Sequence, residues 1–240
     1  MNGALASDVA MVLAAGLGKR MRPLTASRPK PLVRVAGKPL IDYTLDKLKE
    51  AGVARAVVNV HYMADQMIAY LANRAAPAIK ISDESSALLE TGGGMIKALP
   101  LIGSDPFFCI NSDNIWLDGP TNAFAALSRA WDAQQMDALL LLVGHARAFN
   151  HEGRGDFQLD PLGRIARRKP GRVAPFISTG LQLVSQRLLR DAPSGAFSTG
   201  MLWDRAIAEG RLYGVSHTGL WFEVGAPHMI APTEAALLGG

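Results

Sequence analysis

Cysteine and charge are both scarce in this chain of 240 residues, and no apolar run is long enough to cross a membrane. The single cysteine, Cys109, excludes an intramolecular disulfide, and its neighbours Phe107, Phe108 and Ile110 predict a buried side chain. Residues 1–8 lack the basic start of a secretory signal, and no apolar stretch reaches the roughly 18 residues of a membrane span. We therefore expect a soluble, cytoplasmic protein with no membrane partner.

Disorder and nucleic-acid binding are also disfavoured by the composition. Charged residues make up 19% of the chain and hydrophobic residues 49%, with no repeat or low-complexity linker, so a real core can form. The net charge of +4 is too small to indicate a nucleic-acid partner by itself. The length suits one domain.

Strand and helix signals alternate through the first half of the chain. The predicted strands cover residues 9–15, 54–60, 79–82, 107–111 and 138–143, and the predicted helices cover 40–51, 63–73, 95–99 and 122–135. This alternation predicts an α/β fold with a mostly parallel sheet and helices on both faces. Because ligands bind at the carboxyl ends of such strands, the loops after residues 15, 59, 82 and 111 should face one cleft.

The second half of the chain is richer in strand signals. A hairpin is predicted over 156–168 with its turn at 160–163, further strands over 174–184, 211–216 and 221–224, and helices over 186–190, 198–209 and 226–238. We expect these pieces to form a β-rich lid region over the same cleft.

A cluster of cations follows the first predicted strand. Seven lie between residues 19 and 38 with no acidic residue among them: Lys19, Arg20, Arg22, Arg28, Lys30, Arg34 and Lys38. Glycines after a buried strand let main-chain N–H groups approach phosphate oxygens, and the cations can neutralise a triphosphate. The alternative is a solvated basic face. Dinucleotide and Walker loops both fit badly, because Met21 replaces a required glycine and Arg20 follows Gly18-Lys19.

Longer motifs identify a family. Residues 13–25 read L-A-A-G-L-G-K-R-M-R-P-L-T and residues 29–32 read P-K-P-L, which resembles the signature of the sugar nucleotidyltransferases. The resemblance covers essentially the whole chain, through L-E-T-G-G-G at 89–94, N-S-D at 111–113, G-R-G-D-F at 153–157 and W-F-E-V-G at 221–225. Within the family it is greatest to the N-acetylmuramate α-1-phosphate uridylyltransferases.

The resemblance implies a Rossmann-like fold and a reaction. A single nucleotidyltransferase domain is expected over residues 1–240, with a nucleotide-binding half to about residue 143, a sugar-phosphate-binding half from about 144, and no C-terminal β-helix. The expected partners are an NTP, UTP in this group, and a sugar-1-phosphate, here N-acetylmuramate α-1-phosphate. UMP would be transferred with release of pyrophosphate, in cell-wall recycling. The sequence does not indicate an oligomeric state.

The resemblance also assigns site residues. Nucleotide binding falls to Ala14, Ala15, Gly16, Gly18, Lys19, Glu90, Gly92 and Gly93. Catalytic roles fall to Arg20, Lys30 and Asp113, with Lys30 on the sugar phosphate or α-phosphate, and Arg20 and Lys19 on the leaving phosphates. Sugar-phosphate binding falls to Asp156, Thr179 and Gly180.

A metal site is expected between two carboxylates. Asp113 follows an apolar strand and Glu223 lies in the W-F-E-V-G motif, where the family more often has aspartate. Hard oxygen ligands of this kind suit Mg²⁺. The alternatives are that Asp113 caps the next turn and that Glu223 is a surface carboxylate. The five histidines show no metal-ligand spacing, and packing or surface roles are expected for them.

Other functions stay open at this point. The substrates could be GTP with mannose- or heptose-1-phosphate, or CTP with another phosphorylated acceptor. A regulatory pseudo-enzyme that binds a nucleotide sugar is the non-catalytic alternative.

Overall fold

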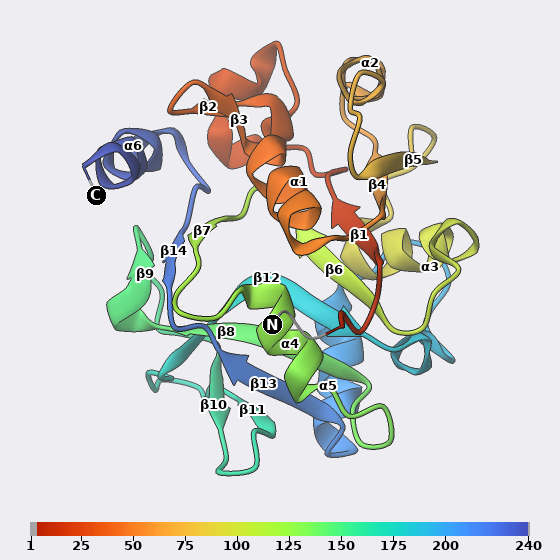
Figure 1. The fold of residues 1–240 in the computed structure, drawn as a ribbon, viewed down its shortest axis with the longest axis vertical. Helices are drawn as coiled ribbons and strands as arrows, with labels where there is room; N and C mark the ends of the chain where they lie inside the picture. The colour runs from red at the N-terminus through yellow and green to blue at the C-terminus, as the bar shows by residue number, and fades with distance from the viewer. Residues whose placement is uncertain (1–3, 240) are drawn as a thin grey trace.

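One mixed sheet of nine strands forms the centre of the molecule (Figure 1). The computed structural model describes residues 4–239, so the first three residues of the segment 1–8 and the last residue of the predicted domain lie outside it. The strands are β1 (Val9–Leu13), β4 (Arg55–Val60), β5 (Ala78–Asp83), β6 (Phe107–Asn111), β8 (Ala138–Gly144), β10 (Phe157–Leu159), β11 (Ile165–Arg167), β12 (Phe176–Val184) and β13 (Leu212–Ser216).

The order of these strands confirms the predicted mostly parallel sheet. The path is β11-β10-β12-β6-β1-β4-β5, with β8 added to β12 and β13 to β8. Within the described residues, only β11 and β12 run against the other strands. The strands of the second half therefore extend the sheet of the first half, with β12 paired to β6.

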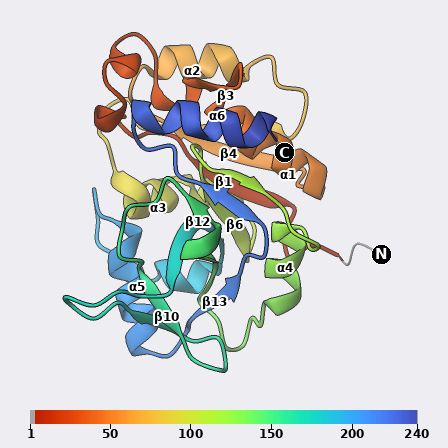
Figure 2. The ribbon, with the colours of Figure 1, turned by 90° about the vertical axis from the view of Figure 1, so that its left-hand side faces the viewer.

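Helices cover both faces of the sheet, as the alternating pattern predicts. They are α1 (Leu40–Ala51), α2 (Ala64–Leu71), α3 (Glu90–Ile102), α4 (Ala123–Ala130), α5 (Thr199–Ala208) and α6 (Ile230–Leu238). Ala10 and Val12 of β1 pack in the core under α1, α2 and α4, whereas Val9 and Met11 pack in the core under α3 and α5. Side chains of a strand alternate between its faces, so one short apolar run fills both cores. Figure 2 shows α3 and α5 on one side of the sheet and α1 and α4 on the other.

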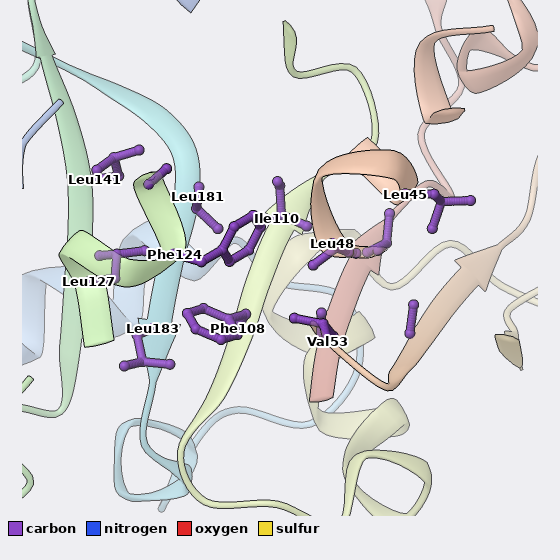
Figure 3. Close-up of a cluster of buried hydrophobic side chains, with 14 of the residues drawn as sticks. Leu45, Leu48, Val53, Phe108, Ile110, Phe124, Leu127, Leu141, Leu181 and Leu183 are labelled. Carbon is purple, nitrogen blue, oxygen red and sulfur yellow. The ribbon is translucent and has the colours of Figure 1, made fainter. Parts of the chain in front are cut away.

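The core under α4 holds β6 firmly in place (Figure 3). Phe108 of β6 and Phe124 of α4 meet edge to face, with ring centroids 5.0 Å apart and an angle of 87° between the rings. Such a pair stabilises its contact beyond the apolar area that it buries. Cys109 is buried on the opposite face, as predicted, and burial raises the pKa of its thiol to about 12. A rigid β6 fixes the residues that follow it.

A second, smaller sheet contains the strand predicted over 221–224 and two strands that the sequence pattern did not predict. It joins β7 (Ile115–Leu117), β14 (Leu220–Phe222) and β9 (Ala148–Phe149), which lie side by side in Figure 1. Strands of two or three residues carry too little periodicity to be recognised. They form here because each pairs with a segment far away in the chain. The predicted hairpin is present as β10 and β11, and the amide of Gly163 donates to the carbonyl of Asp160 across its turn at 3.0 Å.

Four predicted helices are wrong in extent or type. The helix expected over 122–135 ends at Ala130, and the helix expected over 226–238 begins at Ile230. The helix expected from residue 95 begins at Glu90, so the triple glycine lies inside α3. Glycine is unfavourable within helices, but close packing requires it here. A Cβ on Gly92 would lie 2.2 Å from the Phe197 ring, and a Cβ on Gly93 would lie 2.2 Å from the carbonyl oxygen of Gly195. The segment expected as a helix over 186–190 is a single 3-10 turn.

No helix among residues 4–239 combines the length and the apolar character that a membrane crossing requires.

Candidate functional site

Three cavities meet where the central strands end. The first, of about 370 Å³, the second, of about 240 Å³, and the third, of about 390 Å³, all share the side chain of Asn111 at the end of β6. Asp113 lines both the first and the second cavity. The loops after β1, β5 and β6 line the first cavity, as predicted, whereas β4 contributes only Asn59 from within the strand.

The first cavity contains much of the predicted nucleotide site. Its walls include Ala14, Ala15, Gly16, Lys30, Asn59 and Glu90. Glu90 has a left-handed backbone with φ of 58°, which is uncommon for a residue with a side chain. That conformation starts α3 directly at the cavity wall.

A buried network that no sequence motif indicated joins the loop after β1 to the loop after β5. The amide of Ala14 donates to Oδ1 of Asn59 at 2.7 Å, and Nδ2 of Asn59 donates to Oε1 of Glu84 at 2.7 Å. The amide of Leu89 completes the chain by donating to the other oxygen of Glu84 at 3.2 Å. Glu84 is fully buried. Buried carboxylates need such partners, so Glu84 and Asn59 hold both loops in one geometry.

Removing the centre of this network should cost stability. Asn59→Ala leaves the amide of Ala14 and one oxygen of Glu84 without a partner, which should lower the free energy of unfolding by about 1–3 kcal/mol. Urea denaturation checks this value. Asn73→Ala, at an exposed position, is the matched control and should change it little. Equal stability of the two variants would show that the network does not brace the loops.

Lys30 lines the first cavity beside Asp113, which lines both the first and the second. Its ammonium pairs with Oδ2 of Asp113, and both side chains are partly buried. The short turn Lys30–Leu32 follows the extended Pro29, which restricts the backbone around the lysine. Gly18 packs closely against Lys30. Its φ is +60°, and a Cβ there would lie 3.0 Å from Cβ of Lys30 and 3.0 Å from Cγ2 of Thr25.

Some predicted nucleotide-binding residues lie away from the first cavity. Lys19 is exposed and lines none of the three cavities. Gly92 and Gly93 are buried, and their amides donate to the carbonyl of Phe197 at 2.8 and 3.3 Å. Gly92 and Gly93 therefore lie outside the wall of the first cavity. Glu90 and Thr91 line the cavity in their place.

The second cavity brings Asp113 and Glu223 to one site. The small sheet explains how, because Phe222 of β14 pairs with Ile115 of β7. The residue after Phe222 therefore comes opposite the residues before Ile115, and both carboxylates line the cavity. This pairing joins segments more than 100 residues apart, so sequence spacing could not reveal it.

Glu223 is also held by a histidine, contrary to the packing or surface role expected for the histidines. Nδ1 of His151 lies 2.8 Å from Oε2 of Glu223, and His151 lines the second cavity. β9 pairs with β14 through Phe149 and Phe222, which places His151 beside Glu223. No sequence pattern indicated this contact, because a two-residue strand creates it.

Arg20 lines the second cavity because the neighbouring Met21 anchors this segment of the chain. Met21 is fully buried in a third core with Ile115, Phe222 and Val224, which fastens the basic segment to the small sheet. A Cβ on Gly225 would lie 3.2 Å from the guanidinium of Arg20. Of the seven clustered cations, Arg20 and Lys30 are the two that line the first or second cavity.

The predicted sugar-phosphate residues are divided between two cavities. Asp156 and Thr179 line the second cavity, and Gly180 lines the third. The hydroxyl of Thr179 donates to the carbonyl of Leu141 at 2.8 Å, and Asp156 accepts from the amide of Ser178 at 2.9 Å. Gly180 has φ of +80° at an irregularity in the pairing of β12 with β8, and a Cβ there would lie 2.4 Å from Nδ2 of Asn111.

The two carboxylates fit a divalent cation. Asp113 and Glu223 offer hard oxygen ligands on one cavity, and ligating carboxylates are commonly oriented by hydrogen bonds such as that from His151. Among residues 4–239, no three His, Cys, Asp or Glu side chains form a complete metal cage. A cation held by these two carboxylates would take its remaining ligands from phosphate oxygens and water.

Comparison with known proteins agrees with this architecture. The sequence profile described as nucleotidyl transferase matches residues 9–180, which includes the basic loop, α3 and Asp113. The chain belongs to the nucleotidyl transferase family. Nucleotidyltransferases of this family generally use a divalent metal.

Several relatives of the nucleotidyl transferase family match over most of this chain. It is 45% identical over 236 residues to the N-acetylmuramate alpha-1-phosphate uridylyltransferase of Caulobacter vibrioides, which covers 97% of this chain and 98% of that protein. It is 36% identical to the protein of the same name from Neisseria meningitidis serogroup B, over 94% of this chain and 96% of the other. A mannose-1-phosphate guanyltransferase of Aspergillus fumigatus is 29% identical, over 91% of this chain and 61% of that protein.

A solved structure shares the fold. The inositol-1-phosphate CTP transferase of T. maritima superposes with a TM-score of 0.78 over 100% of this chain and 97% of that one, at 20% identity. The likeness shows a common fold and leaves the choice of substrate to the site.

Proposed function

We propose that this nucleotidyltransferase transfers UMP from UTP to N-acetylmuramate α-1-phosphate and releases pyrophosphate. The observation that carries the proposal is the 45% identity over 97% of the chain to an enzyme of that name. The activity would serve the recycling of cell-wall sugars in the cytoplasm. The guanyltransferase relative is less similar, and the match covers only 61% of its length, so we favour uridylyl transfer.

The roles of the residues follow from the cavities that they line. The nucleoside would occupy the first cavity, beside Ala14–Gly16 and Glu90. The phosphates would lie where the first and second cavities meet, at Lys30 and Asp113. Arg20 would contact phosphate oxygens in the second cavity. We retain no phosphate contact for Lys19, since it is exposed outside the cavities.

The reaction needs positioning and charge neutralisation more than proton transfer. The oxygen of a sugar-1-phosphate is already an anion and can attack the α-phosphorus directly, so no general base is required. Lys30 would align the two phosphates and neutralise the charge that develops during transfer. Asp113 and Glu223 would hold Mg²⁺, which supplies further charge neutralisation on the phosphates. His151 would keep Glu223 directed at the cavity.

A substrate matrix tests the proposal. Purified protein is assayed for pyrophosphate release with UTP, GTP, CTP and dTTP against N-acetylmuramate-, N-acetylglucosamine-, mannose- and heptose-1-phosphate. UTP with N-acetylmuramate-1-phosphate should give the highest kcat/KM. If GTP or dTTP is used about tenfold better than UTP, a difference of 1.4 kcal/mol, the uridylyl assignment is wrong even though the reaction class stands.

A further inference from the structure

The third cavity contains a single charged side chain among the described residues that line it, and that side chain is an arginine. Arg167 ends β11 and faces the cavity together with Gln182 of β12 and Trp203 of α5. The cavity shares Asn111 with both other cavities, and it also shares Leu13 and Thr91 with the first. It therefore opens directly beside the place where the phosphates would meet.

The guanidinium of Arg167 is fixed on several sides. Its Nε donates to Oδ1 of Asp204 at 2.7 Å and its Nη2 donates to the carbonyl of Gly200 at 3.1 Å. The guanidinium carbon lies 5.1 Å from the ring centroid of Phe157 and 5.8 Å from that of Trp203. Within residues 4–239, its Nη1 donates no hydrogen bond. The side chain of Arg167 is 40% exposed, and its planar guanidinium keeps this donor for one more anion.

Trp203 and Gln182 lie together in the wall of the third cavity. Its indole nitrogen donates to Oε1 of Gln182 at 3.0 Å, and Gln182 is buried. The walls of the cavity thus combine apolar and aromatic surface with a few fixed polar groups. A volume of about 390 Å³ with such walls is typical of a small-molecule site.

We propose that the third cavity takes the sugar of the acceptor and that Arg167 binds a carboxylate that the sugar carries. This inference rests on the proposed function, since N-acetylmuramate differs from N-acetylglucosamine by a lactyl ether that ends in a carboxylate. A charge-assisted hydrogen bond from an arginine is the strongest polar recognition available to such a group. Arg167 is then a residue that selects the acidic sugar over its neutral analogue.

The test compares two acceptors at saturating UTP. Arg167→Gln should raise the KM for N-acetylmuramate-1-phosphate by about 10- to 100-fold with a smaller change in kcat, because it removes a contact made equally in the ground and transition states. The kinetics with N-acetylglucosamine-1-phosphate should stay nearly unchanged. Arg167→Lys keeps the charge but loses the planar donors, so it should show an intermediate effect.

Two control variants separate recognition from folding. Arg164→Gln removes a cation from the same hairpin outside the cavities and should keep the wild-type preference. Asp204→Asn breaks the same ion pair but keeps the guanidinium, so it should retain most of the preference. Melting curves show whether each variant folds.

The outcomes distinguish the role of Arg167 from the identity of the proposed acceptor. A wild-type protein that prefers N-acetylmuramate-1-phosphate, together with an Arg167→Gln variant that keeps the preference or loses both substrates equally, overturns the role of Arg167 alone. A wild-type protein that shows no such preference contradicts the proposed acceptor itself. If Asp204→Asn and Arg167→Gln weaken the kinetics with both acceptors to the same extent, the ion pair is structural and the inference is also overturned.

Discussion

Asp113→Asn and Glu223→Gln should each lower kcat by at least about 100-fold, because each removes a charged ligand of the cation that neutralises the phosphates. Excess Mg²⁺ should restore only part of the activity. Both carboxylates line the second cavity, although they come from segments far apart in the chain. Steady-state kinetics over a range of Mg²⁺ concentrations measure the effect. Glu209→Gln, at an exposed position, is the control and should behave as the wild type.

The double variant adds information that the single variants lack. If Asp113 and Glu223 hold one ion, the double variant should be little worse than either single variant, because residues that act as one unit are not additive. Glu223→Asp restores the residue more common in the family and should keep substantial activity. Its shorter reach and a weakened contact with His151 should raise the Mg²⁺ requirement.

A different result would move the metal away from Glu223. If Glu223→Gln changes kcat by less than about threefold, under 1 kcal/mol, and leaves the Mg²⁺ dependence unchanged, Glu223 is not a ligand. The transferase assignment would remain, with the metal held by Asp113 and phosphates alone.

Lys30→Ala should reduce turnover far more than it reduces stability. Loss of a charge-assisted contact in a site that excludes water costs about 2–4 kcal/mol of transition-state binding, or roughly 30- to 800-fold in rate. Lys30 pairs with Asp113 at the border of two cavities, so its removal should leave the packing of the cores intact. Single-turnover rates and melting temperatures of the same preparation check both parts.

Lys49→Ala provides the matched control for Lys30→Ala, since Lys49 is exposed in the last turn of α1. It should change neither rate nor melting temperature. If Lys30→Ala turns over at a near-normal rate but melts at a clearly lower temperature, Lys30 is a structural residue.

Features encoded in local sequence were predictable. The alternation of apolar runs predicts the parallel strands β1, β4 and β6, and the ligand-binding edge follows from that topology. The basic motif predicts that Ala14–Gly16 and Lys30 border a cavity, because glycines and cations after a buried strand suit a phosphate site. The resemblance adds Asp113 and Glu223.

Features created by long-range contacts were not predictable. The small sheet that brings His151 to Glu223 depends on strands of two or three residues. The triple glycine resembles a flexible loop in sequence, yet packing against Phe197 keeps it helical. Arg167 belongs to no motif, and its neighbours Gly200 and Asp204 come from α5. Such residues become visible only once the chain is folded.

The most direct test of the central claim is the identity of the product formed from UTP and N-acetylmuramate α-1-phosphate. Purified protein with Mg²⁺ is incubated with both substrates, and the mixture is resolved by anion-exchange chromatography and mass spectrometry. The account predicts UDP-N-acetylmuramate and pyrophosphate in equal amounts, and formation of both at least about 100-fold more slowly by the Asp113→Asn variant. A folded protein that binds UTP but yields no nucleotide sugar with any acceptor of the matrix would contradict catalysis and support a regulatory binding role.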